Sequence, residues 1–211
     1  MEVVILQDRP QIGRVAADAV AGLLNRKPDA VLGLATGSSP LMIYDELVAR
    51  CEAGELSFRQ ARGFTLDEYV GLPADHPERY RNVIDAVLVS RVDFADGAVQ
   101  GPDGLAADIP ASCAAYEAAI RDAGGVDLQI LGIGTDGHIA FNEPGSSLAS
   151  RTRIKTLTRQ TRIDNARFFD DDVDAVPTHC LTQGLGTILE ARHIVLVATG
   201  RGKAEAVHHL V

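Results

Sequence analysis

The sequence is poor in cysteine, and its cysteines lie far apart. Cys51, Cys113 and Cys180 are odd in number and form neither a CxxC pair nor a zinc-ligand spacing. Disulfide frameworks are typical of short secreted chains with paired cysteines, so this pattern argues against a disulfide-stabilised fold. We therefore expect a cytoplasmic protein that folds in a reducing environment.

A long apolar run is also missing. The N-terminal stretch MEVVILQDRP is interrupted by Asp8 and Arg9, which makes it too short for a signal peptide or a membrane span. An excess of basic residues is missing as well, since the 211-residue chain has a formal net charge of −9. Because nucleic-acid backbones bind to cationic surfaces, we expect neither a nucleic-acid partner nor a membrane partner. A small anionic ligand would need only a local group of cations.

What the sequence does contain is a regular alternation of short apolar runs with amphipathic segments. Strands separated by helices imply βαβ units and a mostly parallel sheet that is covered on both faces. We predict an α/β fold of the three-layer αβα type, with a Rossmann-like open, mostly parallel sheet and an active site at the carboxyl ends of its strands. The predicted strands are 3–6, 30–35, 62–66, 126–133 and 193–199, and the predicted helices are 11–25, 41–53, 78–90, 110–123 and a last one that starts near 200.

The chain shows no internal repeat, low-complexity tract or linker, which predicts a single domain over residues 1–211. The last predicted helix reaches Val211 without a glycine cap or a following turn. Helices commonly end in such a signal, so we expect a chain that stops before its natural C-terminus.

Two glycine-containing turns that follow predicted strands can hold an anion. In TGSSP, Gly37, Ser38 and Ser39 precede a helix, whose first N–H groups and positive dipole end favour a phosphate or a carboxylate. A helix cap made by one of the serines is the alternative. In GRGK, Lys203 falls in a first helical turn, where the helix dipole disfavours a cation. A bound phosphate would remove that conflict, and a solvated lysine is the alternative.

A third turn, GTDGHIAFNEPG, follows the predicted strand at 126–133 and contains three groups that can transfer protons. A carboxylate on one nitrogen of His138 would fix the tautomer of the ring while the other nitrogen faces a substrate. Asp136 and Glu143 are both close enough in sequence to supply it. A histidine–carboxylate metal site is one alternative, although this spacing in a loop matches no zinc motif. A structural histidine in a polar turn is the other.

Charged residues in two other stretches also have two interpretations each. LDEY places Asp67 and Glu68 at a strand end, where paired carboxylates can divide acid and base roles or simply begin a turn. RTRIKT alternates with period two, so Arg151, Arg153 and Lys155 share one face if the segment is extended. Such a row of cations can bind an anion, or it can protect an edge strand from aggregation.

Three stretches together resemble the glucosamine-6-phosphate deaminase family: LGLATGSSP, FTLDEYVGLP with the following HPERY, and GIGTDGHIAFNEPGSSLASRTRIKT. NARFFDDDV and VPTHCLTQGLGTIL continue the resemblance, so it covers essentially the whole chain. The FNEP ending is the specific part. The related 6-phosphogluconolactonases resemble the GxGxDGH half but have neither DEYVGL nor FNEP.

The resemblance implies that glucosamine 6-phosphate and water are converted into fructose 6-phosphate and ammonia, without a metal ion or an organic cofactor. It assigns the general base, which moves a proton from C2 towards C1, to Asp67. It assigns the ring-opening relay to His138, oriented and tuned by Asp136 and Glu143. The phosphate-binding positions that it implies are Gly37, Ser38, Ser39 (a threonine in many members), Arg167 and Lys203.

The resemblance also bears on regulation and assembly. In some bacterial members, N-acetylglucosamine 6-phosphate activates the enzyme at a subunit interface, and the enzyme is a hexamer. Family members continue past the position of Val211 with a further strand–helix segment that carries a lid and subunit contacts. By resemblance, an allosteric site in a homo-oligomer would use Ser146, Arg153, Lys155 and Thr156.

Two other functions stay open on the sequence. A 6-phosphogluconolactonase-like sugar-phosphate hydrolase would need the relay, but it would not need Asp67 as a base that acts on carbon. A non-catalytic sugar-phosphate sensor would need only the anion-binding turns. The complete set of Asp67, Asp136, His138 and Glu143 argues against a sensor, because sensing requires no relay.

Overall fold

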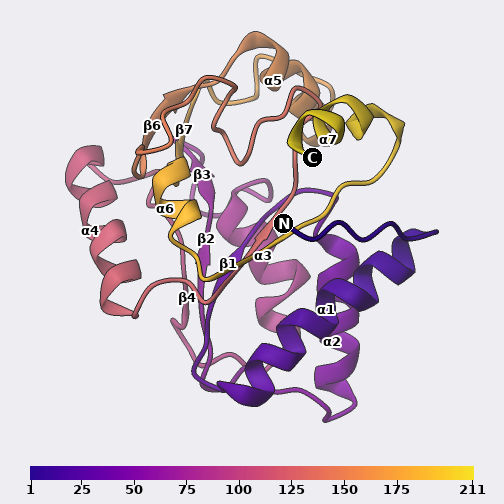
Figure 1. Ribbon diagram of the computed structural model, residues 1–211. Coiled ribbons are helices and arrows are strands. Elements are labelled where there is room, and N and C mark those ends of the chain that lie inside the picture. The colour runs from indigo at the N-terminus through magenta and orange to yellow at the C-terminus, as the bar shows by residue number, and fades with distance from the viewer.

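An open parallel sheet of five strands forms the centre of the molecule, as the computed structural model of residues 1–211 shows (Figure 1). The strand order is β4–β2–β1–β5–β8, and each pair of neighbours is parallel. This confirms the predicted α/β fold with a mostly parallel sheet. The strands are β1 (Val31–Leu34), β2 (Arg62–Thr65), β4 (Val99–Gln100), β5 (Leu128–Leu131) and β8 (His193–Leu196).

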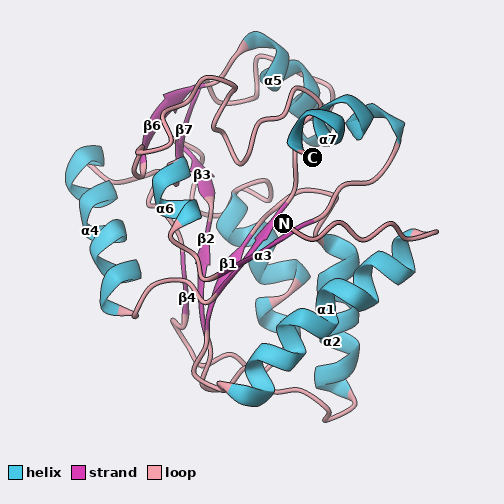
Figure 2. Cartoon of the chain, viewed as in Figure 1, coloured by secondary structure: helices cyan, strands magenta, loops and turns pink.

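Helices cover both faces of this sheet (Figure 2). Helices α1, α2 and α3 lie on one side, and α4 and α6 lie on the other, which is the predicted three-layer arrangement. No helix combines the length and the apolar composition that crossing a membrane requires. The helices are α1 (Arg9–Arg26), α2 (Leu41–Glu52), α3 (Tyr80–Val87), α4 (Ile109–Asp122), α5 (Arg159–Asn165), α6 (Leu185–Leu189) and α7 (Ala204–Leu210).

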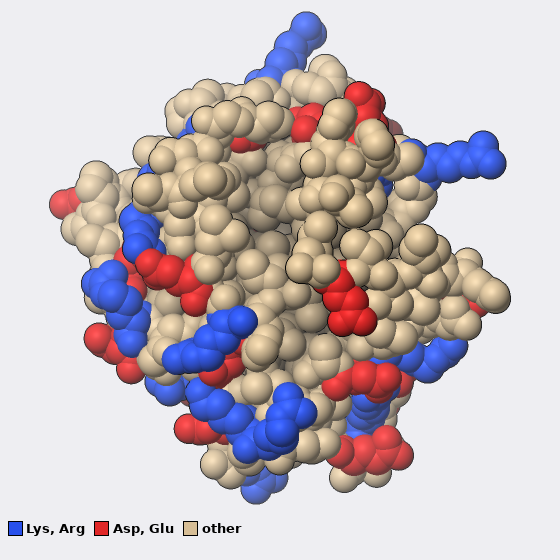
Figure 3. Space-filling model, viewed as in Figure 1, with Lys and Arg blue, Asp and Glu red and all other residues tan.

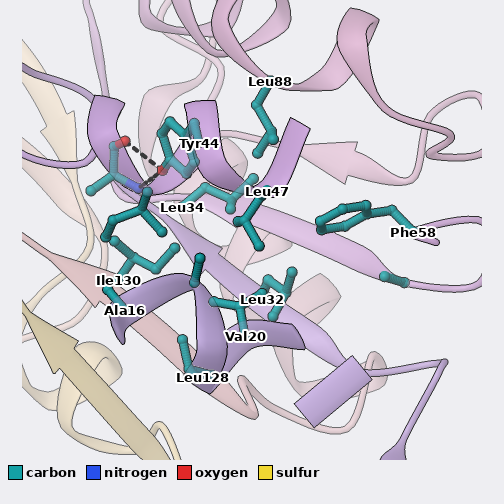
Figure 4. Close-up of a cluster of buried hydrophobic side chains, with 14 of the residues drawn as sticks. Ala16, Val20, Leu32, Leu34, Tyr44, Leu47, Phe58, Leu88, Leu128 and Ile130 are labelled. Atoms are coloured by element: carbon teal, nitrogen blue, oxygen red, sulfur yellow. Dashed lines mark hydrogen bonds between the residues drawn. The ribbon is translucent and has the colours of Figure 1, made fainter. Parts of the chain in front are cut away.

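The main core lies between the sheet and helices α1 and α2. Successive residues of a strand point to opposite faces, so β1 and β5 each send alternate side chains to this side. Burial of a leucine side chain contributes about 1.5–3 kcal/mol, which makes this layer the main support of the sheet. The residues that meet here in Figure 4 include Ala16, Val20, Leu32, Leu34, Tyr44, Leu47, Leu128 and Ile130.

One core residue also fixes the start of a predicted functional turn. The Tyr44 hydroxyl donates a hydrogen bond to the carbonyl oxygen of Ala35 (2.7 Å) and accepts one from the Ala35 N–H (3.0 Å). Both backbone groups of the residue that follows β1 are therefore satisfied by one side chain of α2. The TGSSP turn leaves the sheet from a fixed point.

A second sheet, which the apolar pattern does not predict, lies beyond the carboxyl end of β2. It consists of β3 (Asp67–Tyr69), β7 (His179–Thr182) and β6 (Arg153–Thr156), which pair antiparallel in the order β3–β7–β6. Only Leu66 separates β2 from β3, so Asp67 stands where the two sheets join. A smaller core holds this part of the molecule together and contains Tyr69, Phe141, Leu157, Phe169 and Val176.

The predicted strand at residues 3–6 is wrong. Val3, Val4 and Ile5 are 51%, 56% and 92% exposed, and residues 1–6 form neither a helix nor a strand. β-branched residues stabilise a strand through packing on a neighbour and through the hydrogen bonds of a ladder. No strand of this structure pairs with these residues, so their β-strand propensity is not enough to form a strand.

Candidate active site

Four neighbouring strands of the large sheet carry the predicted site residues just past their carboxyl ends. Asp67 follows β2, the TGSSP turn follows β1, the GTDGH turn follows β5, and Lys203 follows β8. The chain order reverses between β1 and β5, and ligands of open α/β sheets bind in the crevice at such a point. Figure 3 shows the surface hollowed near the middle of this face, below the part of the molecule that Figure 1 labels α5 and α7.

The TGSSP turn leaves its serine hydroxyls free. Gly37 has φ +96°, a conformation that other residues rarely adopt, and this turns the chain back towards α2. Pro40 is the N-cap of α2, and no side chain caps this helix end. The helix-cap alternative for Ser38 and Ser39 is therefore wrong, and anion binding by this turn stays a prediction. Arg9 donates from Nη2 to the Ser38 carbonyl oxygen over 3.0 Å and holds the turn from the side of α1.

The GTDGH turn holds the His138 ring against a carboxylate. Nδ1 of His138 is buried and lies 2.8 Å from Oδ1 of Asp136, although the angle is not that of a hydrogen bond. The same oxygen accepts the backbone N–H of His138 over 3.1 Å, which fixes the Asp136 side chain within the turn. Gly134 is required here, because a Cβ at that position would lie 2.3 Å from Nδ1. With Nδ1 enclosed, Nε2 is the ring nitrogen left to serve a ligand.

Glu143 completes this group from the other end of the turn. One ligand atom from each of Asp136, His138 and Glu143 lies within 4.8 Å of the others, so by distance the three could hold a metal ion. However, Oε1 of Glu143 already accepts a hydrogen bond of 2.9 Å from the Thr161 hydroxyl. The Nδ1 atom of His138 faces Asp136. These contacts favour a proton relay over a metal centre.

The charge state of the relay follows from its surroundings. Burial of Asp136 disfavours its charged form, but the backbone N–H and the ring of His138 outweigh this, and the pKa of Asp136 lies below its usual value. Asp136 is therefore a carboxylate at neutral pH. A carboxylate beside Nδ1 orients the ring and leaves Nε2 to take and return a proton.

Two predicted phosphate ligands lie close enough to affect each other. Lys203 is the last residue of a short 3-10 helix (Arg201–Lys203) before α7. Partial burial lowers the pKa of Lys203; nearby Asp136 acts in the opposite direction, and Arg167 lowers it further. The Arg167 guanidinium lies 4.7 Å above the Phe168 ring and forms no ion pair. Two neighbouring cations that form no ion pair can be stabilised by a bound anion.

Asp67 is the most perturbed carboxyl group of the site. It is 6% exposed, and no group of the chain donates a hydrogen bond to its carboxylate. Burial, followed by the nearby negative charge of Glu68, raises the pKa of Asp67 to about 8. A buried carboxylate that accepts no hydrogen bond from the chain binds a proton strongly. Such a group suits the removal of a proton from carbon better than an exposed aspartate does.

Asp67→Asn is expected to raise the free energy of unfolding by an amount that grows with pH. Because the folded-state pKa is raised, the native protein must keep this proton while the unfolded chain loses it above about pH 4. The stabilisation should grow by up to about 1.4 kcal/mol per pH unit and level off near pH 8. Urea unfolding of both proteins at pH 5, 6.5 and 8 measures it. A difference that stays constant over this range would contradict the raised pKa.

Glu68, the second carboxylate of LDEY, has a different task. Neighbouring residues of a strand point to opposite sides, so β3 directs Glu68 away from Asp67. Its oxygens accept the backbone N–H groups of Tyr80 and Arg81, each over 3.0 Å, at the start of α3. Arg79 lies 3.6 Å from it as an ion-pair partner. Glu68 therefore anchors a helix N-terminus and does not share a proton with Asp67.

One hydroxyl links the Asp67 strand with the GTDGH turn. Thr182 of β7 is the pairing partner of Asp67, and its Oγ1 accepts the Phe141 backbone N–H over 3.2 Å. A second link runs from Asn165 of α5, whose Nδ2 donates to the Tyr69 hydroxyl over 2.9 Å. These contacts tie the strand that carries Asp67 to the GTDGH turn and to α5. No motif marked Thr182 or Asn165 as part of it.

The predicted effector positions are only partly brought together. Arg153 and Lys155 share one face of β6, whereas Thr156 points to the other face, and Ser146 lies in the turn after Glu143. Arg153 alone of the four lines a cavity of about 540 Å³ between α4 and β6. Arg151, in the same stretch, is paired with Glu190. An allosteric role for these positions stays a prediction.

Comparison with known proteins identifies the family and the fold. Residues 10–211 match the family described as glucosamine-6-phosphate isomerases/6-phosphogluconolactonase. The chain is 82% identical over 211 residues to a glucosamine-6-phosphate deaminase of Mycolicibacterium smegmatis, covering all of this chain and 81% of that protein. It superimposes on a monomeric glucosamine-6-phosphate deaminase with a TM-score of 0.96 at 41% identity, covering 100% of this chain and 87% of the other. A 6-phosphogluconolactonase of Thermotoga maritima, with 21% identity and a TM-score of 0.76 over 98% of this chain and 88% of the other, shares the fold.

Proposed function

The chain belongs to the family of glucosamine-6-phosphate isomerases and 6-phosphogluconolactonases, and we propose that it is a deaminase of glucosamine 6-phosphate. It converts glucosamine 6-phosphate and water into fructose 6-phosphate and ammonia. Relatives that share 82% and 74% of its residues carry the deaminase name. The observation that carries the proposal is the buried carboxylate of Asp67, to which no group of the chain donates a hydrogen bond. A lactonase breaks no carbon–hydrogen bond, so it does not need such a base.

The phosphate group binds between the turn after β1, the short 3-10 helix after β8 and the short 3-10 helix after α5. The free N–H groups at the start of α2 and the hydroxyls of Ser38 and Ser39 surround one side of it. Lys203 and Arg167, which lie close enough to affect each other, neutralise its charge. This contact holds the sugar with its C1–C2 end towards Asp67 and His138.

Ring opening is the first chemical step. Nε2 of His138 takes the proton of the C1 hydroxyl, and the imidazolium so formed returns a proton to the ring oxygen. The bond between C1 and that oxygen breaks, and C1 becomes an aldehyde. Asp136 stabilises the imidazolium that forms in between, and Glu143 assists from the other end of the turn.

Asp67 then acts on the open chain. Its carboxylate takes the proton from C2, the electron pair forms a C1–C2 double bond, and the C1 oxygen gains a proton from solvent. The ammonium group of the substrate loses a proton to solvent, which gives a neutral enolamine. Return of the proton to C1 leaves an iminium group at C2. Water adds to C2, and ammonia leaves to give the ketone. A positively charged amino group on the substrate favours the ionised form of Asp67, which the isolated site holds back.

The site draws residues from both sheets, and we propose that residues 1–211 act as one domain. The family resemblance and the structural comparison point to different assembly states. Some members of the family are hexamers, whereas the deaminase with a TM-score of 0.96 is described as monomeric. Light scattering of the purified chain gives its mass and distinguishes a homo-oligomer from a monomer.

A coupled assay for both products tests the proposed function. We expect ammonia and fructose 6-phosphate to appear in equal amounts when glucosamine 6-phosphate is added. Hydrolysis of 6-phosphogluconolactone without ammonia release would instead support the lactonase. Binding of glucosamine 6-phosphate in calorimetry without any turnover would support the sensor.

Lys203→Ala is expected to raise KM for glucosamine 6-phosphate about ten- to a hundredfold and to leave kcat within about threefold. Its contact with the phosphate is present in the ground state and in the transition state alike, so its loss weakens binding without slowing the chemistry. Steady-state kinetics measures both constants. Arg201→Ala, which removes an exposed cation from the same short helix, is the matched control. An unchanged KM in Lys203→Ala would rule out the phosphate contact.

A further inference from the structure

A buried threonine on α5 reaches into the relay. Thr161 is 7% exposed, and its hydroxyl donates a hydrogen bond of 2.9 Å to Oε1 of Glu143. We propose that Thr161 is a positioning residue for ring opening: its hydroxyl holds the carboxylate of Glu143 towards Asp136 and His138. This inference rests on the deaminase function proposed above.

The hydrogen bonds around Thr161 leave only one direction for its proton. The Thr161 N–H donates to Oγ1 of Thr158, the N-cap of α5, over 3.1 Å. The two hydroxyl oxygens lie 2.8 Å apart. A hydroxyl has one proton to give, so if Thr161 donates to Glu143, Thr158 must donate to Thr161. Each hydroxyl in this series of hydrogen bonds then has a partner. The N-cap residue Thr158 thereby directs the Thr161 proton towards the Glu143 carboxylate.

Glu143 needs such a partner to stay in place. Its side chain has several rotatable bonds and follows a turn, so an unheld carboxylate would gain rotamer entropy by turning to water. Asp136 is its other neighbour, with a ligand atom within 4.8 Å. A hydrogen bond from Thr161 to a charged group is strong enough to oppose the entropic cost.

The same segment carries two other functional contacts. Asn165, one turn after Thr161 on α5, bonds the Tyr69 hydroxyl, and Arg167 follows in the next short helix as a phosphate ligand. Thr161 therefore joins the ring-opening relay to the segment that binds the phosphate and supports the Asp67 strand. A substrate whose phosphate binds Arg167 therefore also fixes the position of α5, and through Thr161 it fixes the side chain of Glu143.

Thr161→Val tests the hydroxyl with little change in shape. We expect kcat for glucosamine 6-phosphate to fall about ten- to thirtyfold while KM stays within about twofold. Affinity for 2-amino-2-deoxyglucitol 6-phosphate, an open-chain analogue that needs no ring opening, should also stay within about twofold in calorimetry. Thr161→Ser keeps the donor and is expected to restore kcat to within about threefold of the wild type.

Thr187→Val is the matched control. Thr187 is 4% exposed, and its hydroxyl donates to the carboxylate of Glu117 over 2.6 Å, away from the relay. The change removes the same kind of bond from a site of similar burial. We expect a similar loss of thermal stability in Thr161→Val and Thr187→Val, with kcat lowered only in the first.

Three results would overturn the positioning role. They are an unchanged kcat in Thr161→Val, a parallel loss of kcat and analogue affinity, and a failure of Thr161→Ser to restore kcat. A crystal structure of Thr161→Val in which Glu143 keeps its wild-type side-chain torsions would also overturn it, and this needs no activity. The failure of the proposed function is distinct, because the wild type itself would then release no ammonia.

Discussion

Asp67→Asn is expected to lower kcat for ammonia release by about a thousandfold, the largest effect of any single change in this site. The amide has the shape of the carboxyl group but cannot accept the C2 proton. The Asp67 site contains no second base, because Glu68 points to the other side of β3 and is bound to the start of α3. Exchange of the C2 proton with solvent should disappear together with turnover. Proton NMR of the sugar in deuterated water follows the exchange, and the coupled assay follows ammonia.

Substrate affinity separates this result from a loss of the fold. The proposed phosphate ligands lie in the turn after β1 and in two short 3-10 helices, not on β3, so calorimetry with the open-chain hexitol phosphate should give a dissociation constant within about threefold of that of the wild type. The variant should also unfold at a higher urea concentration at pH 8, because it no longer buries a group that ionises there. Persistence of C2 exchange at the wild-type rate would show that another group removes the proton.

The two carboxylates of LDEY show where inference from the sequence stops. Their spacing permits a pair that shares a proton, and the residue types alone do not tell base from anchor. The resemblance assigned the base to Asp67. The structure adds the physical difference: Asp67 accepts no hydrogen bond from the chain, whereas Glu68 accepts the N–H groups of Tyr80 and Arg81. Those N–H groups belong to a helix that begins twelve residues later, as the separation of Glu68 and Tyr80 shows, and no local pattern links them.

Apolar runs predicted the large sheet well because most of them are buried from both faces. Residues 30–35 and residues 3–6 look alike as sequence, yet only the first run became a strand. β1 has β2 on one side and β5 on the other, while Val3, Val4 and Ile5 have no partner. An apolar run records the tendency to be buried, and the neighbour that buries it lies elsewhere in the chain.

Contacts between distant segments account for the part of the site that sequence reasoning missed. Thr161 and Glu143 are 18 residues apart, and Asn165 and Tyr69 are 96 residues apart. Threonine and asparagine are common on helix surfaces, so nothing in NARFF or its surroundings distinguishes them. Asp136, His138 and Glu143 could be singled out because they lie in a glycine turn that follows a strand, whereas the resemblance singled out Asp67. Their supporting partners could be found only once α5 was placed over the turn.

His138→Gln is expected to lower kcat about a hundred- to a thousandfold, somewhat less than Asp67→Asn. Without the imidazole, the enzyme must wait for sugar that has opened in solution, and a small residual rate remains because Asp67 still acts on that form. His193→Gln, at an exposed histidine of β8, is the matched control and should keep full activity. Affinity for the open-chain analogue should be unchanged in both variants. Calorimetry with the open-chain analogue thus measures binding, whereas turnover of the cyclic sugar also depends on ring opening. Complete loss of C2 exchange together with loss of analogue binding would contradict this division of roles, because it would mean that His138 holds the open chain as well as producing it.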